Sequence, residues 1–190
     1  QGLSPEGFKH QFDVNLLGVF HCVQAYLDLL GADQEREGRA GKIIKISSVA
    51  GKAATPFMGA CSMSKFGLEG LSEAMRREFL MYGIDVAIIA PGPVKTPIWE
   101  KFDATGLAER YSNSPMREPM ERMLAYADEL ADKGCDPQRI ADCVADILAE
   151  RKTKTRYTID TTSGQRRFLS MLPKRTSDRL IGAQLGLTKK

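Results

Sequence analysis

The sequence predicts an α/β fold in which helices connect the strands of a parallel sheet. Segments with apolar side chains at helical spacing alternate along the chain with short β-branched segments, and this alternation is typical of parallel sheets with helical crossovers. The segment 84–90 is almost entirely apolar, as expected for a strand that is buried on both faces. A chain of 190 residues is long enough for one domain with a substantial core.

The first predicted helix covers about residues 5–30. Ser4 is placed to cap it and Pro5 suits its first turn. The side chains that recur at helical spacing are Phe8, Phe12, Leu16, Phe20, Val23 and Leu27. The polar segment 32–41 then breaks the helix, and the β-branched run "KIIKISS" predicts a strand over 42–48.

A second long helix is predicted from Ala60 to about Tyr82, with Gly83 as its C-terminal stop. Its apolar positions are Phe66, Leu68, Leu71, Met75 and Phe79. The buried strand 84–90 follows, and the proline-rich "PGPVKTP" after it predicts a rigid turn.

The last part of the chain is less regular. Residues 98–134 have no clear period until "PMERMLAYADELADKG", which predicts a helix over 119–134. Asp136 and Pro137 begin a further helix that ends near Arg151, and "TRYTID" predicts a third strand. Two short helices separated by Pro173 are expected in the tail.

The charge balance gives no reason to expect nucleic acid as a partner. The net charge is +3, from 27 basic and 24 acidic side chains. The basic cluster "RKTKTR" at 151–156 is best interpreted as a solvated helix end, although a weak contact with an acidic or membrane surface stays open.

Neither a metal site nor a transmembrane segment is expected. The four cysteines and two histidines lack the clustering of zinc ligands. Nothing demands a disulfide, which favours the reducing cytoplasm. We find no signal peptide and no uninterrupted apolar stretch of the roughly 18 to 20 residues that a membrane span needs. The chain begins at Gln1 without a methionine, so a processed, trimmed or partial product is an interpretation that stays open.

Two polar segments follow predicted strands directly, namely Ser47–Ser48 and "PGPVKT" at 91–96. In parallel sheets the ligand lies beyond the carboxyl ends of the strands, so both segments are expected at one rim. A third segment, "GACSMSK", places Cys61 and Lys65 four residues apart, on one face of a helix.

These motifs resemble the short-chain dehydrogenase/reductase family, with the likeness running from about Ser4 to Leu187. The matching motifs, in the family's order and spacing, are Asn15 in "FDVNLLGVF", Ser48 in "ISSVAG", the frame ending in Lys65, and "PGPVKT". The segment "YGIDVAIIAPGPVKTPIW" is similar to members that act on steroids, retinol or similar apolar alcohols.

The resemblance implies a Rossmann-like, doubly wound parallel sheet with helices on both faces. The chain would be a single domain, 1–190, equivalent to the C-terminal part of a family member and lacking its N-terminal strands. Residues 98–134 would be a substrate-loop insertion. The family also implies a homo-dimer or homo-tetramer.

The implied activity is hydride transfer between NAD or NADP and a small-molecule alcohol or ketone. In the family a serine binds the substrate oxygen, a lysine holds the nicotinamide ribose, and an asparagine orders a water. These roles map onto Ser48, Lys65 and Asn15, while Cys61 stands at the position of the catalytic tyrosine. The cofactor-binding turn maps onto Pro91, Gly92, Val94 and Thr96.

Two departures from the family pattern predict impaired activity. Beside Lys65 the Cys61 thiol should be acidic enough for proton transfer, but it is several ångströms too short to reach the position of a tyrosine hydroxyl. The glycine-rich "TGxxxGxG" loop is absent. We therefore expect weak dinucleotide binding by this chain alone. The strand at 42–48 should have an open edge, which either a longer protein or a partner copy would cover.

Several alternatives stay open. The apolar set Trp99, Phe102, Leu107, Met116, Met120 and Met123 suits a bulky lipophilic substrate, or equally a cap on the core. A different class of function is a non-catalytic module that binds a ligand or dimerises. A third is a hydrolase with Ser48 or Cys61 as nucleophile, although a nucleophile needs an adjacent base and His10 and His21 both lie on the first helix.

Overall fold

The computed structural model describes residues 3–33, 35–100, 106, 111, 113–161, 164, 169 and 171–188. The chain folds into two compact units. The first consists of residues 3–92 and 138–159 and contains the sheet, and the second consists of residues 93–137 and 160–190.

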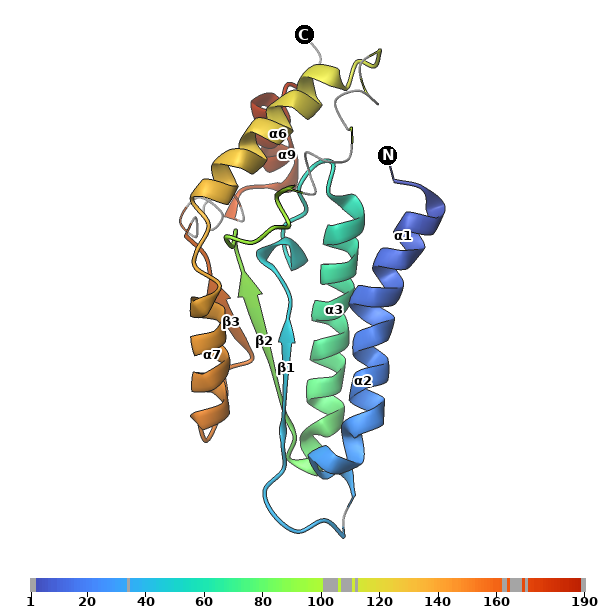
Figure 1. Ribbon diagram of the computed structural model, residues 1–190, viewed down its shortest axis with the longest axis vertical. Helices are drawn as coiled ribbons and strands as arrows, with labels where there is room; N and C mark the ends of the chain where they lie inside the picture. The colour runs from blue at the N-terminus through green and yellow to red at the C-terminus, as the bar shows by residue number, and fades with distance from the viewer. Residues whose placement is uncertain are drawn as a thin grey trace. The chain divides into compact units, whose positions relative to one another are not determined.

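The first unit is built on a three-stranded parallel sheet. Its strands are β1 (Lys42–Ile46), β2 (Asp85–Pro91) and β3 (Arg156–Ile159), in the order β1-β2-β3. The predicted strands and their parallel arrangement are confirmed. Every residue of β2 after Asp85 is buried, because this strand has a neighbour on each side and helices over both faces (Figure 1). A nearly continuous apolar sequence is typical of a strand that is buried on both faces.

The long N-terminal helix is confirmed, but it is not uniformly α-helical. It consists of α1 (Pro5–Phe12), the π-helical η1 (Asp13–Leu17), α2 (Gly18–Leu27) and the π-helical η2 (Asp28–Ala32). The Ser4 hydroxyl accepts a hydrogen bond from the Gly7 amide and caps the first turn, as predicted. Gly31 turns the chain out of the helix with a φ of 127°, a value that favours glycine.

The same helix is apolar enough to be compared with a membrane span. Pro5–Ala32 has a mean hydropathy of 1.3 over its best window, and few residues of that window are buried. Among the described residues it alone is long and apolar enough to cross a bilayer by these two criteria. Core helices of soluble proteins also meet them, so the observation is weak support for a span.

Helices cover both faces of the sheet. Helix α3 (Gly59–Glu78) lies beside α2 over one face and ends in the 3₁₀ turn η4 (Phe79–Tyr82), while α7 (Gln138–Ala149) covers the other (Figure 1). Gly83, with a φ of 67°, stops α3 as predicted. The core on the α3 side contains Val23, Ile43, Met75, Phe79, Ile84 and Val86. The core on the α7 side contains Ala87, Ile89 and Ile147.

Strand β1 ends two residues earlier than the sequence predicts. The backbone of Ser47 still donates to the carbonyl of Ile89, at 2.8 Å, but Ser48 caps a 3₁₀ turn, η3 (Val49–Gly51). The hydroxyl of Ser48 bonds to the Ala50 amide and so competes with continuation of the strand.

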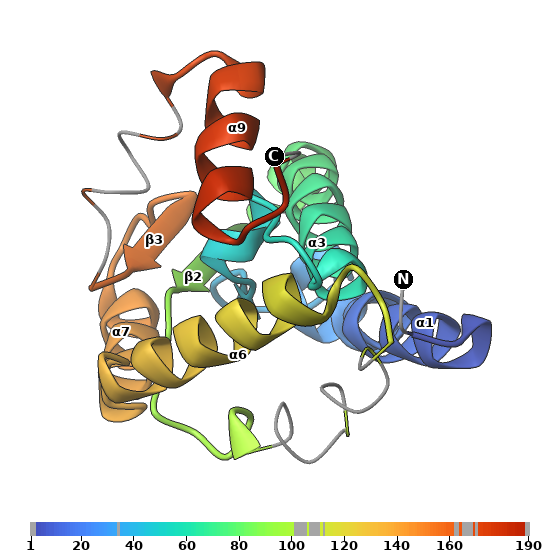
Figure 2. The same cartoon turned by 90° about the horizontal axis from the view of Figure 1, so that it is seen from above.

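The second unit contains α6 (Arg117–Asp132) and α9 (Lys174–Gln184), which are viewed from above in Figure 2. The helix predicted over 119–134 is therefore confirmed, with its start at Arg117. Helix α9 follows Pro173 as predicted, whereas the preceding tail helix falls largely outside the described residues. Of the apolar set, Met120 and Met123 are buried. Phe102 and Leu107 lie outside the described residues.

Candidate functional site

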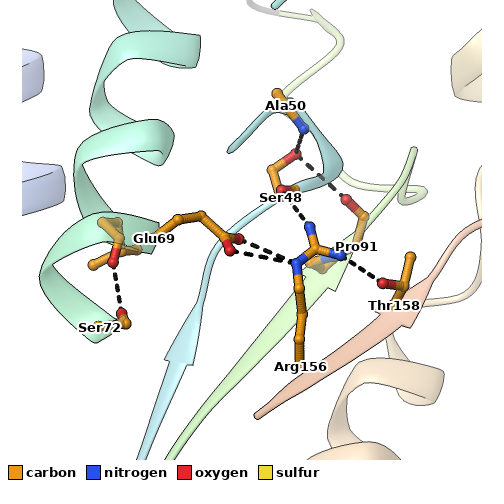
Figure 3. A network of polar contacts seen from close by, with 8 residues as sticks. Ser48, Ala50, Glu69, Ser72, Pro91, Arg156 and Thr158 are labelled. Atoms are coloured by element: carbon orange, nitrogen blue, oxygen red, sulfur yellow. Dashed lines mark hydrogen bonds and ion pairs between the residues drawn. The ribbon is translucent and has the colours of Figure 1, made fainter. Parts of the chain in front are cut away.

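Ser48 lies where β1 ends and joins the ends of two strands. Its hydroxyl donates to the carbonyl of Pro91 at 3.3 Å and accepts from the amide of Ala50 at 3.1 Å (Figure 3). Pro91 is the last residue of β2. The expectation that the Ser48 segment and the start of "PGPVKT" meet at one rim of the sheet is therefore confirmed for Pro91. Gly92 continues this rim, since its amide donates to the carbonyl of Ile159 at 2.8 Å.

Asn15 lies in the π-helical segment η1 and reaches α3. Its side-chain amide donates to the Ser64 hydroxyl at 3.1 Å, and that hydroxyl donates to the carbonyl of Cys61 at 2.9 Å. Ser64 is fully buried. The structure thus links Asn15 to the turn of α3 that carries both Cys61 and Lys65, although Asn15 and Ser64 are 49 positions apart in the sequence.

Lys65 connects α3 to the end of β1. Its ammonium group donates to the carbonyl of Ile46 at 3.0 Å. Burial lowers the pKa of Lys65, and the neighbouring Cys61 opposes that shift. An ammonium group can donate three hydrogen bonds, so the bond to Ile46 leaves donor capacity for a ligand.

The Cys61 thiol is less acidic than the sequence suggests. Burial raises the pKa of Cys61 above its ordinary value, and the attraction of the Lys65 ammonium only partly opposes this effect. The prediction that Lys65 would make the thiol acidic is therefore wrong, because desolvation of the charged form outweighs the nearby charge. The raised pKa also disfavours Cys61 as a hydrolase nucleophile, which would have to be a thiolate.

A cavity of about 670 Å³ lies along β1 within the first unit. Asn15, Ile46 and Lys65 are among its lining residues, with apolar side chains of α2 forming much of its wall. Ser48 and Cys61 are not part of the lining. The remaining N–H donors of Lys65 match the hydroxyl groups of a ribose in their chemistry, so Lys65 fits the nicotinamide-ribose portion of a dinucleotide.

Val94 and Thr96 belong to the second unit, whereas the other predicted site residues belong to the first. Val94 forms a parallel bridge with Cys135. The amide of Cys135 donates to the carbonyl of Pro93 at 2.9 Å, and the amide of Lys95 donates to the carbonyl of Cys135 at 3.0 Å. These bonds hold the backbone of the turn, while the Thr96 side chain is exposed.

Sequence reasoning missed an ion pair beside Ser48. Nε of Arg156, on β3, lies 3.4 Å from each carboxylate oxygen of Glu69, on α3 (Figure 3). Nη2 of the same guanidinium donates to the carbonyl of Ser48 at 3.4 Å. The two partners are 87 positions apart in the sequence, so no local pattern indicates the pair. The only available signal was that Glu69 stands four residues after Lys65, on the same side of the helix.

Comparison with known proteins identifies the family. A family model described as short chain dehydrogenase matches residues 1–106. The NADPH-dependent 3-dehydrocapnine reductase of Ornithobacterium rhinotracheale is 34% identical over 154 residues, which are 81% of this chain and 53% of that protein. The 3-ketodihydrosphingosine reductase of Bacteroides thetaiotaomicron is 31% identical over 77% of this chain and 52% of that protein.

A solved structure supports the same assignment. 4-hydroxyisoleucine dehydrogenase complexed with NADH is 27% identical to this chain and superposes with a TM-score of 0.58, over 84% of this chain and 60% of that one. The chain spans about half the length of the curated relatives it matches. From the matched motifs, the parallel sheet and these comparisons, the chain belongs to the short-chain dehydrogenase/reductase family, a family of oxidoreductases with a Rossmann-like α/β fold.

Proposed function

We propose that this chain forms the substrate and nicotinamide side of an NAD(P)-dependent oxidoreductase that acts on a lipophilic alcohol or ketone. The observation that carries the proposal is the cluster around one turn of α3. Asn15 bonds to Ser64, Ser64 bonds to the Cys61 carbonyl, and Lys65 bonds to the end of β1. Asn15, Ser48 and Lys65 keep the residue types expected at three of the family's four functional positions. Two of them, Asn15 and Lys65, take part in this cluster.

A nicotinamide cofactor, when bound, supplies the hydride that is exchanged with the carbonyl carbon. Lys65 would hold the nicotinamide ribose through its remaining N–H groups. Ser48 would bind the substrate oxygen, for which its hydroxyl hydrogen must turn away from the carbonyl of Pro91. The residue at position 61 would donate the proton that completes a carbonyl reduction.

Cys61 makes that last step slow. A general acid must approach within about 2.6–3.2 Å of the atom it serves, or act through one water. The cysteine side chain ends one bond beyond Cβ, and the pKa of its thiol is raised by burial. We therefore propose a low reductase activity.

The substrate class is supported by the names of the two curated relatives, which describe reductases of a 3-dehydro and a 3-keto compound. Met120 and Met123 on α6 are only 3% and 2% exposed, so these two side chains belong to the core rather than to a surface for a ligand.

The same proposal places the protein in the cytoplasm as a homo-oligomer. All four cysteines are free thiols, in keeping with a reducing compartment. Exposed apolar side chains on the N-terminal helix and α3 offer a surface for a second copy; they include Val14, Leu17, Tyr26 and Phe66.

A titration with reduced nicotinamide mononucleotide tests the cofactor site without the adenosine half. We expect the backbone amide signals of Ile46 and Lys65 to shift, and Lys65→Met to abolish the shift. Lys52→Met is the matched control, because Lys52 is exposed. Competition with NADH and NADPH then ranks the two cofactors. Absence of any shift, or equal shifts in the Lys65 variant, would refute the cofactor site.

The raised pKa and short reach of Cys61 favour one alternative, a non-catalytic module that keeps the ligand site. In that case the mononucleotide binds as above, but no carbonyl compound is reduced even with tyrosine at position 61.

A further inference from the structure

A partly buried ion pair joins three elements of the first unit at the Ser48 turn, residues 48–51. The Arg156 and Glu69 side chains are only 21% and 12% exposed. Besides the carboxylate, the guanidinium contacts the hydroxyl of Thr158 at 2.6 Å through Nη1 and the carbonyl of Ser48 at 3.4 Å through Nη2 (Figure 3). The planar guanidinium is suited to several bonds in fixed directions. Arg156 therefore bridges β3, α3 and the end of β1.

The carbonyl that Arg156 contacts is also the one that closes the Ser48 turn. The amide of Gly51 donates to the carbonyl of Ser48 at 3.0 Å. A shift of the guanidinium would therefore act on the backbone of the turn itself, and through it on the Ser48 side chain.

Gly51 packs the turn directly against α3. A Cβ atom at this position would lie 2.9 Å from Cγ of Glu69 and 3.1 Å from the carbonyl oxygen of Lys65. Contacts this short leave no room for a side chain. The Cγ methylene of Glu69 and the backbone of Lys65 thus form part of the surface on which the Ser48 turn lies.

We infer that Glu69 and Arg156 are a positioning pair, which fixes Ser48 relative to Cys61 and Lys65 on α3. The inference rests on the proposed function for the role of Ser48 in binding a substrate oxygen. The pair itself acts through the turn. A displacement of about 1 Å at a reacting centre can lower a rate by about 10²-fold, so loss of the pair should reduce turnover without removing any catalytic group.

Amide hydrogen exchange measures this positioning independently of activity. The amides of Ala50 and Gly51 bond to the hydroxyl and the carbonyl of Ser48, so their exchange rates report on the turn. We expect Glu69→Gln and Arg156→Gln to speed exchange at both amides on the order of 10- to 100-fold, the effect of losing a hydrogen bond to a charged group. Exchange at the centre of β2 should stay unchanged.

Glu73→Gln is the matched control. Glu73 lies one turn further along α3 and pairs with Arg77, but both side chains are at least half exposed. This change should leave the Ala50 and Gly51 amides as they are, because exposed ion pairs contribute little. Equal exchange in the Glu69 and Glu73 variants would overturn the inference, as would a uniform rise in exchange through the sheet and α3.

Two further variants cover the case in which Glu69→Gln does not fold. Thr158→Val keeps the β-branched shape but removes the 2.6 Å bond that orients Arg156, and we expect an intermediate rise in exchange at Ala50 and Gly51. The double charge reversal Glu69→Arg with Arg156→Glu should restore part of the protection that either single reversal loses. No rise with Thr158→Val, or no restoration by the double reversal, counts against the pair.

Measurements of catalytic activity provide a second, independent test. Where reduction is measurable, Glu69→Gln should lower kcat by about 10²-fold and leave the affinity for the nicotinamide mononucleotide unchanged, since Lys65 is intact. A protein that reduces no carbonyl compound refutes the proposed function, while the exchange rates still decide whether the pair positions Ser48. An equal loss of mononucleotide affinity would show general disruption and would overturn the inference.

Discussion

The ammonium group of Lys45 lies 2.8 Å from the thioether sulfur of Met75, and both side chains are buried. Lys45 is on β1 and faces α3, so its long side chain occupies a place in the core next to Ile43 and Met75. A thioether is only a weak acceptor. Burial accordingly lowers the pKa of Lys45 to about 8.

We predict that Lys45→Met stabilises the protein. Methionine is apolar and similar in length, and replacing a poorly compensated buried charge should raise the free energy of unfolding near pH 7 by about 1–3 kcal/mol. The pKa of 10.5 in the unfolded chain exceeds that of about 8 in the folded protein. The unfolded state therefore binds more protons between these values, and the wild type gains stability as the pH rises through them. The advantage of the variant should shrink over the same range.

Urea unfolding at several pH values between 7 and 10.5 checks both parts. Lys52→Met, at an exposed position, should change the free energy of unfolding by less than about 0.5 kcal/mol. A Lys45 variant less stable than the wild type near pH 7 would show that the ammonium is well compensated.

Cys61→Tyr should increase carbonyl reduction. The phenol supplies the reach that the thiol lacks, and a positioned general acid contributes about 10²–10⁴-fold in rate. The comparison is with Cys61→Phe, which adds the same ring without the hydroxyl group. Both variants are assayed for oxidation of the reduced nicotinamide cofactor with a lipophilic ketone. Equal rates for the two would contradict the proposed role of position 61.

Gly51→Ala should destabilise the fold. The new Cβ would lie 2.9 Å from Cγ of Glu69, 3.0 Å from the Ser47 hydroxyl and 3.1 Å from the carbonyl of Lys65, and overpacking of this kind costs about 1–3 kcal/mol. Gly70→Ala is the control, because Gly70 lies on α3 with nothing within 4 Å of an added Cβ. That change should stabilise the helix by about 0.5–1 kcal/mol. Thermal unfolding of the two variants should give shifts of opposite sign.

Ile147→Ala should be far more damaging than Leu148→Ala. Ile147 is fully buried against Ala87 and Ile89 of β2, whereas its neighbour Leu148 is 60% exposed. Truncating a buried isoleucine costs about 2–5 kcal/mol, and the exposed leucine should cost less than about 0.5 kcal/mol. Denaturant midpoints measured side by side test this. Similar losses in both would mean that α7 does not cover the sheet as described.

The elements of the sheet could be predicted from the sequence because their signals are local. The prediction of β2 needs only its own apolar run, and the prediction of the helix end needs only Gly83. Both predictions are confirmed. The pKa of Cys61 could not be predicted, because it depends on how far the folded chain buries the thiol. Burial raises this pKa and outweighs the opposing effect of Lys65.

The contacts of the site depend on distant residues for the same reason. The bond from Asn15 to Ser64 and the pair of Arg156 with Glu69 join elements far apart in sequence. Family resemblance placed Asn15 at the site. No periodicity or spacing in the sequence could have indicated that Arg156 contacts the Ser48 turn.

Strand β1 pairs with β2 alone among the described strands, and Ile46 at its end is 44% exposed. A row of backbone donors and acceptors with an apolar flank is a template for any extended peptide. When this chain is purified by itself, its concentration limit should be set by intermolecular strand pairing rather than by heat. A short soluble peptide of strand-forming sequence, added in excess, should then delay precipitation by capping that edge.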